Sequence, residues 1–123
     1  MKKHILIVDD QEAIRDLLRM TLGTVDYQLD EADSSELALQ KITQLKPDLV
    51  LLDVMLPGSL DGYQLCERIK SDEDTRSIVV ILLTARGQVM DIEKGKAVGA
   101  DDYIVKPFSP AELKERIVSV CGW

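Results

Sequence analysis

Polar side chains that could do chemistry together stand directly after short apolar runs in this 123-residue chain. They are Asp9, Asp10, Asp53, Thr84 and Lys106. A short, uninterrupted apolar run is typical of a strand buried on both faces of a parallel sheet. Since parallel strands deliver their carboxyl ends to one edge of the sheet, we expect the carboxylates, the hydroxyl and the ammonium to converge there.

The three carboxylates predict a metal site. Neighbouring carboxylates repel one another and raise one another's pKa unless a cation lies among them. Mg²⁺, or Mn²⁺, binds carboxylate and carbonyl oxygens together with water, which suits Asp9, Asp10 and Asp53. An aspartate that follows a strand also often caps the next turn or helix, and this alternative stays open for Asp9 and Asp10.

Asp53 has the chemistry of a nucleophile, because carboxylates form aspartyl-phosphates. Phosphoryl transfer asks mainly for positioning and for neutralisation of charge. Lys106 would pair with Asp53 and then hold a phosphoryl oxygen, while Thr84 could donate its hydroxyl to another. The simpler alternatives are a surface lysine and an ordinary strand-end threonine.

Five strands alternating with five helices must position these residues. The strands are expected at 5–8, 27–32, 49–52, 78–83 and 103–105. The helices are expected at 11–22, 33–45, 62–69, 88–97 and from 109 onward. This alternation predicts a single doubly wound α/β domain over residues 1–123, with a parallel sheet and helices on both faces.

Two of the helix starts carry capping signals. Asp33 followed by Glu36 three residues later predicts an N-cap at Asp33, and Ser109 before Pro110 and Glu112 predicts another. Spacing also predicts the buried stripes of two helices. They are Ile14, Leu17, Leu18 and Leu22 in the first helix, and Leu113, Ile117 and Val120 in the last.

The composition limits the location and the partners of the chain. A net charge of −7 argues against nonspecific binding to nucleic acid or to anionic membranes. No apolar run approaches the roughly 20 residues that span a bilayer, and no signal peptide is recognisable. Cys66 and Cys121 lack metal-ligand spacing, which predicts free thiols and a reducing, cytoplasmic location.

The combined pattern resembles a known family. Asp9-Asp10, Asp53, Thr84-Ala85 and Lys106-Pro107-Phe108, in this order and strand context, closely resemble the receiver domain of two-component response regulators. The resemblance covers the whole chain and implies strand order 2-1-3-4-5. It also implies a signalling switch that accepts a phosphoryl group from a histidine kinase or a histidine phosphotransfer protein. Such a switch catalyses only its own phosphorylation and dephosphorylation, so no external substrate is expected.

The resemblance assigns roles by position. Asp53 becomes the phosphoacceptor. Asp10, Asp53 and the backbone carbonyl of Met55 become direct Mg²⁺ ligands, and Asp9 acts mostly through water.

Further positions match the groups that contact the phosphoryl group in this family. They are Lys106, Thr84 and the backbone N–H of Ala85, and the bond between Lys106 and Pro107 is expected to be cis. Tyr103 matches the switch aromatic. On phosphorylation Thr84 would move inward, the space that it leaves would admit Tyr103, and the surface of the last two helices would change. That surface is the expected site for a downstream protein or for a second copy of the chain, around Lys94, Lys96, Asp102, Lys114 and Arg116.

The loop after Pro57 departs from the pattern. Gly58, Ser59 and Leu60 precede Asp61, which makes the loop one residue longer than in many members of the family. The loop geometry and the docking of a kinase therefore remain open. Met55 and Arg86 occupy positions that flank the phosphoryl group and influence its lifetime in the family.

Rival functions fit the residues less well. A phosphatase of the haloacid-dehalogenase type has a second aspartate two residues after the nucleophile, where this chain has Met55. A flavodoxin-like FMN binder needs a phosphate loop after the first strand, where Asp9 and Asp10 would repel phosphate. A phosphorylation-independent scaffold would not need the chemical residues. The run 106–110 resembles receivers joined to winged-helix transcription factors, although these 123 residues contain no DNA-binding module.

Overall fold

In the residues that the structure describes, five strands and five helices alternate, as the sequence predicts. This computed structural model describes residues 2–23, 26–85 and 89–123. The strands are β1 Lys3–Val8, β2 Tyr27–Ala32, β3 Leu49–Asp53, β4 Val79–Ala85 and β5 Asp102–Lys106. The helices are α1 Glu12–Leu22, α2 Ser35–Leu45, α3 Gly62–Ser71, α4 Val89–Ala97 and α5 Pro110–Cys121.

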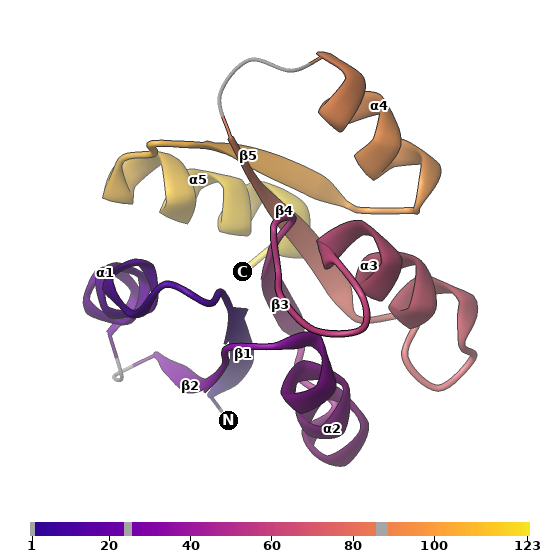
Figure 1. Ribbon diagram of the computed structural model, residues 1–123. Helices are drawn as coiled ribbons and strands as arrows, with labels where there is room; N and C mark the ends of the chain where they lie inside the picture. The colour runs from indigo at the N-terminus through magenta and orange to yellow at the C-terminus, as the bar shows by residue number, and fades with distance from the viewer. Residues whose placement is uncertain (1, 24–25, 86–88) are drawn as a thin grey trace.

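The strands form one parallel sheet of order β2-β1-β3-β4-β5, which confirms the predicted fold class. Helices α1 and α5 cover one face of the sheet, and α2, α3 and α4 cover the other (Figure 1). With β3 at its centre, the sheet carries the carboxyl end of that strand to the middle of one edge.

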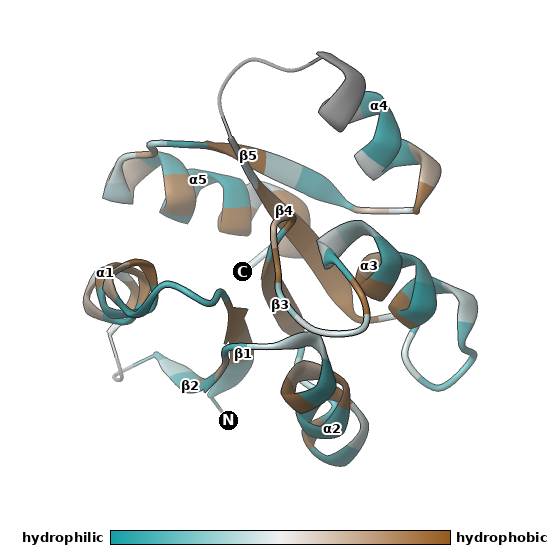
Figure 2. Cartoon of the chain, viewed as in Figure 1, coloured by the Kyte–Doolittle hydropathy of each residue, from teal (hydrophilic) through white to brown (hydrophobic). Residues whose placement is uncertain are grey.

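Alternate residues of each strand enter two separate hydrophobic clusters, one on each face of the sheet. On the face of α1 and α5, the inner strands contribute Ile5, Ile7, Leu49, Leu51, Ile81 and Leu83. On the opposite face they contribute Leu6, Val8, Val50, Leu52, Val80 and Leu82. Figure 2 shows apolar residues running along the central strands. All five residues of β3 are buried, as expected of a central parallel strand.

The N-cap predicted at Ser109 is confirmed, while the N-cap predicted at Asp33 is wrong. The Ser109 hydroxyl accepts a hydrogen bond from the backbone N–H of Glu112. In α2 the cap is Ser34, whose hydroxyl accepts from the backbone N–H of Leu37. Glu36 consequently stands one position earlier in the helix than predicted, where its carboxylate can leave the helix and contact another segment.

The helix stripes are confirmed in part. Ile14 is half-buried and packs against the hydrophobic cluster on the face of α1 and α5. Leu18 and Leu22 are buried in α1, and Leu113 and Ile117 are buried in α5. Leu17, however, is 40% exposed, because α1 turns it away from the sheet. Val120 is only half-buried.

Cys66 is buried and Cys121 half-buried, and both are free thiols. Burial raises the pKa of each thiol to about 11, which keeps both protonated at neutral pH. In the part of the chain that the structure describes, no helix combines the length and the apolar character needed to cross a bilayer.

Candidate functional site

The parallel register brings the predicted residues to one edge of the sheet. β1 and β3 run side by side, so Asp9 and Asp53 follow on adjacent strands. Lys106 ends β5 opposite Ala85 of β4. Asp9, Asp53 and Lys106 all continue the alternation that faces α1 and α5, because side chains alternate along a strand with period two. All three side chains therefore emerge on the same side of the edge.

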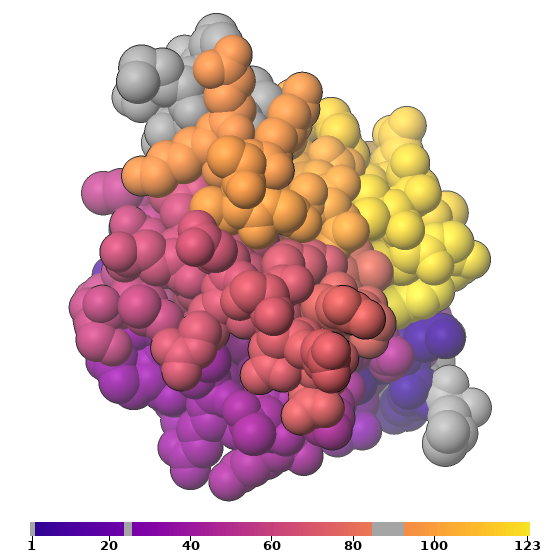
Figure 3. Space-filling model, turned by 90° about the vertical axis from the view of Figure 1, so that its right-hand side faces the viewer, coloured from indigo at the N-terminus to yellow at the C-terminus, as the bar shows by residue number. Residues whose placement is uncertain are grey.

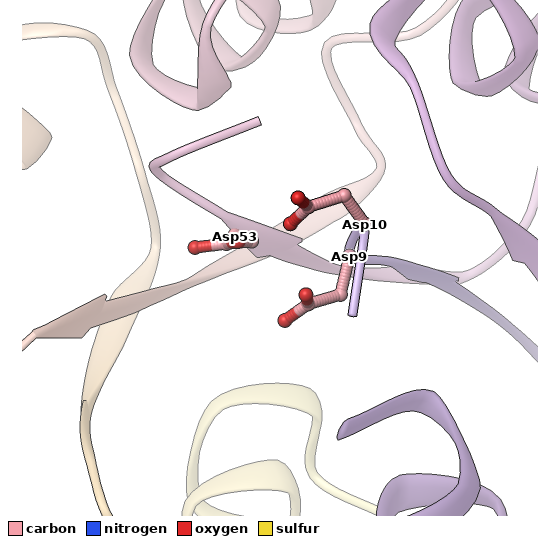
Figure 4. Close-up of side chains that lie close together, drawn as sticks. All are labelled: Asp9, Asp10 and Asp53. Carbon is pink, nitrogen blue, oxygen red and sulfur yellow. The ribbon is translucent and has the colours of Figure 1, made fainter. Parts of the chain in front are cut away.

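The three aspartates form a compact acidic cluster. Carboxylate oxygens of Asp9, Asp10 and Asp53 lie within 4.8 Å of one another, and Figure 4 shows them projecting from the ends of β1 and β3. Asp9 and Asp53 are buried, whereas Asp10 is exposed. Solvent therefore reaches the cluster on the side of Asp10, whereas the side of Asp9 is enclosed by protein.

Lys106 forms the ion pair with Asp53 that the sequence predicts, and it lies closer still to Asp9, a pairing that was not predicted. Its Nζ is 3.0 Å from Asp9 Oδ2 and 3.5 Å from Asp53 Oδ1. Asp9 is fully buried, and a buried carboxylate is costly unless a cation or donors compensate it. Its other oxygen, Oδ1, accepts from the backbone N–H of Gln11. Both Asp9 oxygens are therefore engaged within the protein.

The environment of Asp53 raises its pKa. Burial is the largest cause, and the negative charge of Asp9 adds to it. The backbone N–H of Met55, which donates to Asp53 Oδ1 at 3.1 Å, and the charge of Lys106 act in the opposite direction. The carboxylate is consequently less stable than in water, and an added cation would favour it.

The acidic cluster fits a hard divalent cation. Lys106 contributes one positive charge against the three carboxylates, so negative charge remains in excess. Oxygen ligands of this kind suit Mg²⁺ or Mn²⁺. Met55 follows Asp53 by two residues on the open side of the cluster, and its side chain is 77% exposed.

Thr84 and Tyr103 share the opposite face of the sheet. Thr84 is buried in β4, and Tyr103 of β5 pairs with Leu82, two residues before Thr84. Tyr103 is half-buried and lines a small pocket of about 110 Å³ together with Gly95 and Lys96 of α4. The peptide bond between Lys106 and Pro107 is cis. Of the other predicted positions, Ala85 ends β4, and Arg86 lies outside the described residues.

The residues of the predicted partner surface lie on α4, β5 and α5. Asp102 of β5 and Arg116 of α5 form an ion pair at 3.2 Å, and Lys114 is exposed on α5. The side chain of Lys94 points toward α3, where its Nζ lies over the ring of Tyr63, 4.7 Å from the ring centroid. It therefore joins the rim of the acidic cluster, in a pocket of about 500 Å³ that Asp10 also lines.

Three contacts near the cluster were not predicted from the sequence. Arg15 of α1 donates to the backbone carbonyl of Asp9 at 2.8 Å and pairs with Glu31 of β2 at 3.0 Å. Glu36 of α2 accepts from the backbone N–H of Ser59 at 3.0 Å. The contacts with Glu31 and Ser59 join residues 16 and 23 positions apart, and no local spacing rule indicates them.

Comparison with known proteins identifies the family of this chain. Residues 5–118 match the model of the response regulator receiver domain. The phosphate regulon transcriptional regulatory protein PhoB of Pseudomonas aeruginosa is 48% identical over 118 residues, which cover 96% of this chain and 51% of PhoB. PhoB of Escherichia coli is 43% identical over 120 residues, covering 98% of this chain and 52% of that protein. The chain thus spans about half the length of the curated relatives it matches.

Solved structures agree with the family assignment. The receiver domain of sensor histidine kinase PA1611 from Pseudomonas aeruginosa, which holds a magnesium ion in its active site cleft, is 28% identical. It matches with a TM-score of 0.88 over 100% of both chains. The family match, the common fold and the acidic cluster at the end of β3 point the same way. The chain therefore belongs to the response regulator receiver domain family.

Proposed function

We propose that this receiver domain, a phosphorylation-activated switch of two-component signalling, takes its phosphoryl group on Asp53. The observation that supports this proposal is the placement of Asp53, at the end of the central strand, with Asp9, Asp10 and Lys106 around it. The domain extends over residues 1–123 in this proposal.

Asp10, Asp53 and the backbone carbonyl of Met55 would hold Mg²⁺, or Mn²⁺, directly. Asp9 would act through water, since both of its oxygens are already bonded to Lys106 and Gln11. The bound cation would neutralise charge on the carboxylates and on the phosphoryl oxygens.

In the transfer step an Asp53 carboxylate oxygen attacks the phosphorus of a phosphohistidine. The new P–O bond forms as the P–N bond breaks, and the electron pair of the broken bond stays on the imidazole, which takes up a proton from solvent. Lys106 leaves its contact with Asp9 and holds a phosphoryl oxygen. The hydroxyl of Thr84 and the backbone N–H of Ala85 donate to the others.

The same event would drive the switch. Thr84 and Tyr103 lie on one face of the sheet, so movement of Thr84 toward the phosphoryl group changes the space available to Tyr103. The affected surface is that of α4, β5 and α5. In Figure 3 the coloured end of α4 and β5, in orange, adjoin α5, in yellow. Lys96, Asp102, Lys114 and Arg116 would contribute to it, with Lys94 at the border toward α3.

The partners follow from this role. A histidine kinase or histidine phosphotransfer protein supplies the phosphoryl group, in the cytoplasm, and a downstream protein or a second copy of the chain binds the altered surface. The domain itself binds neither nucleic acid nor membrane in this proposal. The domain does not act on external substrates and changes only its own phosphorylation state.

The deciding experiment is incubation with Mg²⁺ and acetyl phosphate, followed by intact-mass analysis. We expect one adduct of about 80 Da that is labile to base. It should be absent from Asp53→Asn and from wild type treated with a chelator. An adduct that persisted in Asp53→Asn would place the modification elsewhere. Absence of an adduct from wild type with Mg²⁺ bound would leave the scaffold alternative or a strictly kinase-dependent receiver.

A further inference from the structure

The longer loop between β3 and α3 is tied to the first turn of α2. The backbone N–H of Ser35 donates to the carbonyl of Pro57 at 3.2 Å, and the Ser35 hydroxyl accepts from the N–H of Leu60 at 3.1 Å. The carboxylate of Glu36 accepts from both the N–H and the hydroxyl of Ser59, at 3.0 and 3.2 Å. We call these contacts the α2 clamp.

The α2 clamp is an ordered contact. Ser35 is fully buried, and its hydroxyl also donates to Glu36 at 2.7 Å. Hydrogen bonds from Ser35 and from the Ser59 N–H lower the pKa of Glu36. Gly58 fits between them only because it has no side chain. Its φ is +117°, and an added Cβ would lie 2.4 Å from the Ser35 hydroxyl.

The clamped loop carries the backbone next to the acidic cluster. On one side of the clamp, the N–H of Met55 donates to Asp53 at 3.1 Å. On the other side, the N–H of Gly62 donates to the carbonyl of Val54 at 3.1 Å. The Met55 carbonyl therefore stands on a short segment that is held at Asp53 and at Pro57.

We propose that Ser35 and Glu36 are positioning residues that pre-order the β3–α3 loop for cation binding. The inference rests on the proposed function, because it assumes that the Met55 carbonyl contributes to a Mg²⁺ site. A loop that is already ordered loses less conformational freedom when it takes up a ligand, which strengthens binding. Neither residue touches the cation or the phosphoryl group.

The test compares Ser35→Ala and Glu36→Ala with wild type, with Glu73→Gln as the matched control. Glu73 is an exposed glutamate in the turn between α3 and β4, at the opposite edge of the sheet. Calorimetric titration with MgCl₂ gives the Kd. We expect Ser35→Ala to weaken Mg²⁺ binding about tenfold and Glu36→Ala about threefold, because only Ser35 is buried. Glu73→Gln should leave the Kd unchanged, and Glu36→Gln, which keeps an acceptor oxygen, should recover part of the loss.

Two further readouts separate positioning from general damage. Amide hydrogen exchange at Ser59 and Leu60, measured without Mg²⁺, should accelerate in both alanine variants while exchange in β3 stays slow. Phosphorylation by acetyl phosphate should reach the wild-type rate, within about twofold, once Mg²⁺ saturates the variant. A lower rate at saturation with an unchanged Mg²⁺ half-saturation would overturn the inference.

The outcomes distinguish this inference from the proposed function. If wild type binds Mg²⁺ and the variants bind it equally well, the positioning role is wrong and the proposed function stands. If wild type itself binds no Mg²⁺, the proposed function fails and takes the positioning role with it.

Discussion

Asp53 is held where its negative charge is unfavourable. Burial and the neighbouring Asp9 raise its pKa, so the folded state binds a proton at Asp53 more tightly than the unfolded chain does. Stability that depends on this group is present below the ordinary aspartate pKa of 3.8 and is lost as pH rises through the raised pKa. The proposed phosphoacceptor is therefore kept at a cost to stability.

Replacing Asp53 by asparagine should therefore stabilise the protein. In the presence of a chelator at pH 7, we expect Asp53→Asn to raise the free energy of unfolding by about 1 kcal/mol, because it removes the buried charge. The gain should vanish near pH 3, where Asp53 is protonated in both states. Urea unfolding across this pH range measures it, and a constant or reversed difference would contradict the role assigned to burial and Asp9.

Lys106 compensates the most deeply buried carboxylate of the site. Lys106→Met keeps the length of the side chain but leaves the fully buried Asp9 without its cation. We expect a loss of about 2 kcal/mol, below the usual cost of breaking a buried pair because Lys106 is 22% exposed. Chemical unfolding in the chelated state measures the loss. Lys114→Met, at an exposed position, is the control and should change stability little.

A double variant tests whether Lys106 also stabilises the carboxylate of Asp53. If the ammonium compensates both carboxylates, Lys106→Met should cost less in the Asp53→Asn background than in wild type. Equal costs in the two backgrounds would show that the 3.5 Å contact with Asp53 carries no interaction energy.

At the scale of elements, α3 begins in direct contact with the end of β3. An added Cβ at Gly62 would lie 2.2 Å from the Asp53 carbonyl oxygen and 2.5 Å from the Val54 Cα. Asp61 and Gln64 form a capping box that holds this helix start in place. The backbone at the start of α3 therefore packs directly against the backbone at the end of β3, and a shift of either would displace Asp53.

Gly62→Ala should be much more costly than alanine at a glycine in open space. We expect a loss of about 3 kcal/mol or more, together with weaker Mg²⁺ binding. Gly122→Ala is the comparison, because Gly122 has a φ of +72° but no atom within 4 Å of an added Cβ. It should cost about 1 kcal/mol. Thermal unfolding of both variants measures the two losses of stability. Equal losses would mean that the contact between Gly62 and the backbone of Asp53 is not tight.

At the scale of the whole molecule, the three carboxylates at the edge of the sheet repel one another, and a bound cation would reduce this repulsion. Mg²⁺ at ten times its Kd should raise the free energy of unfolding by about 1.4 kcal/mol, because it binds the folded state. Thermal unfolding measures this gain, with KCl of equal ionic strength as the control. Asp10→Asn should abolish the gain, and a gain that survives in this variant would place the cation elsewhere.

The sequence alone was enough to predict the order of strands and helices and the polar residues that gather where the strands end. Apolar runs such as 49–52 and 78–83 are strand signals in themselves, and a polar residue after each run is visible without coordinates. The strand order came from the family resemblance. Capping was partly predicted. Ser109 followed a strong local pattern, whereas Asp33 and Ser34 both offered capping oxygens, and the path of α2 selected Ser34.

Only the tertiary structure decided which charges meet. Lys106 pairs more closely with Asp9 than with Asp53, and Lys94 of α4 lies over the ring of Tyr63 in α3. The α2 clamp joins residues that are 22 to 25 positions apart. Hydrophobic periodicity and the residue types that follow each strand are local properties, so the sequence is enough to recognise them. The partner of a charged side chain depends on distances across the sheet and on burial, which exist only after the elements have packed.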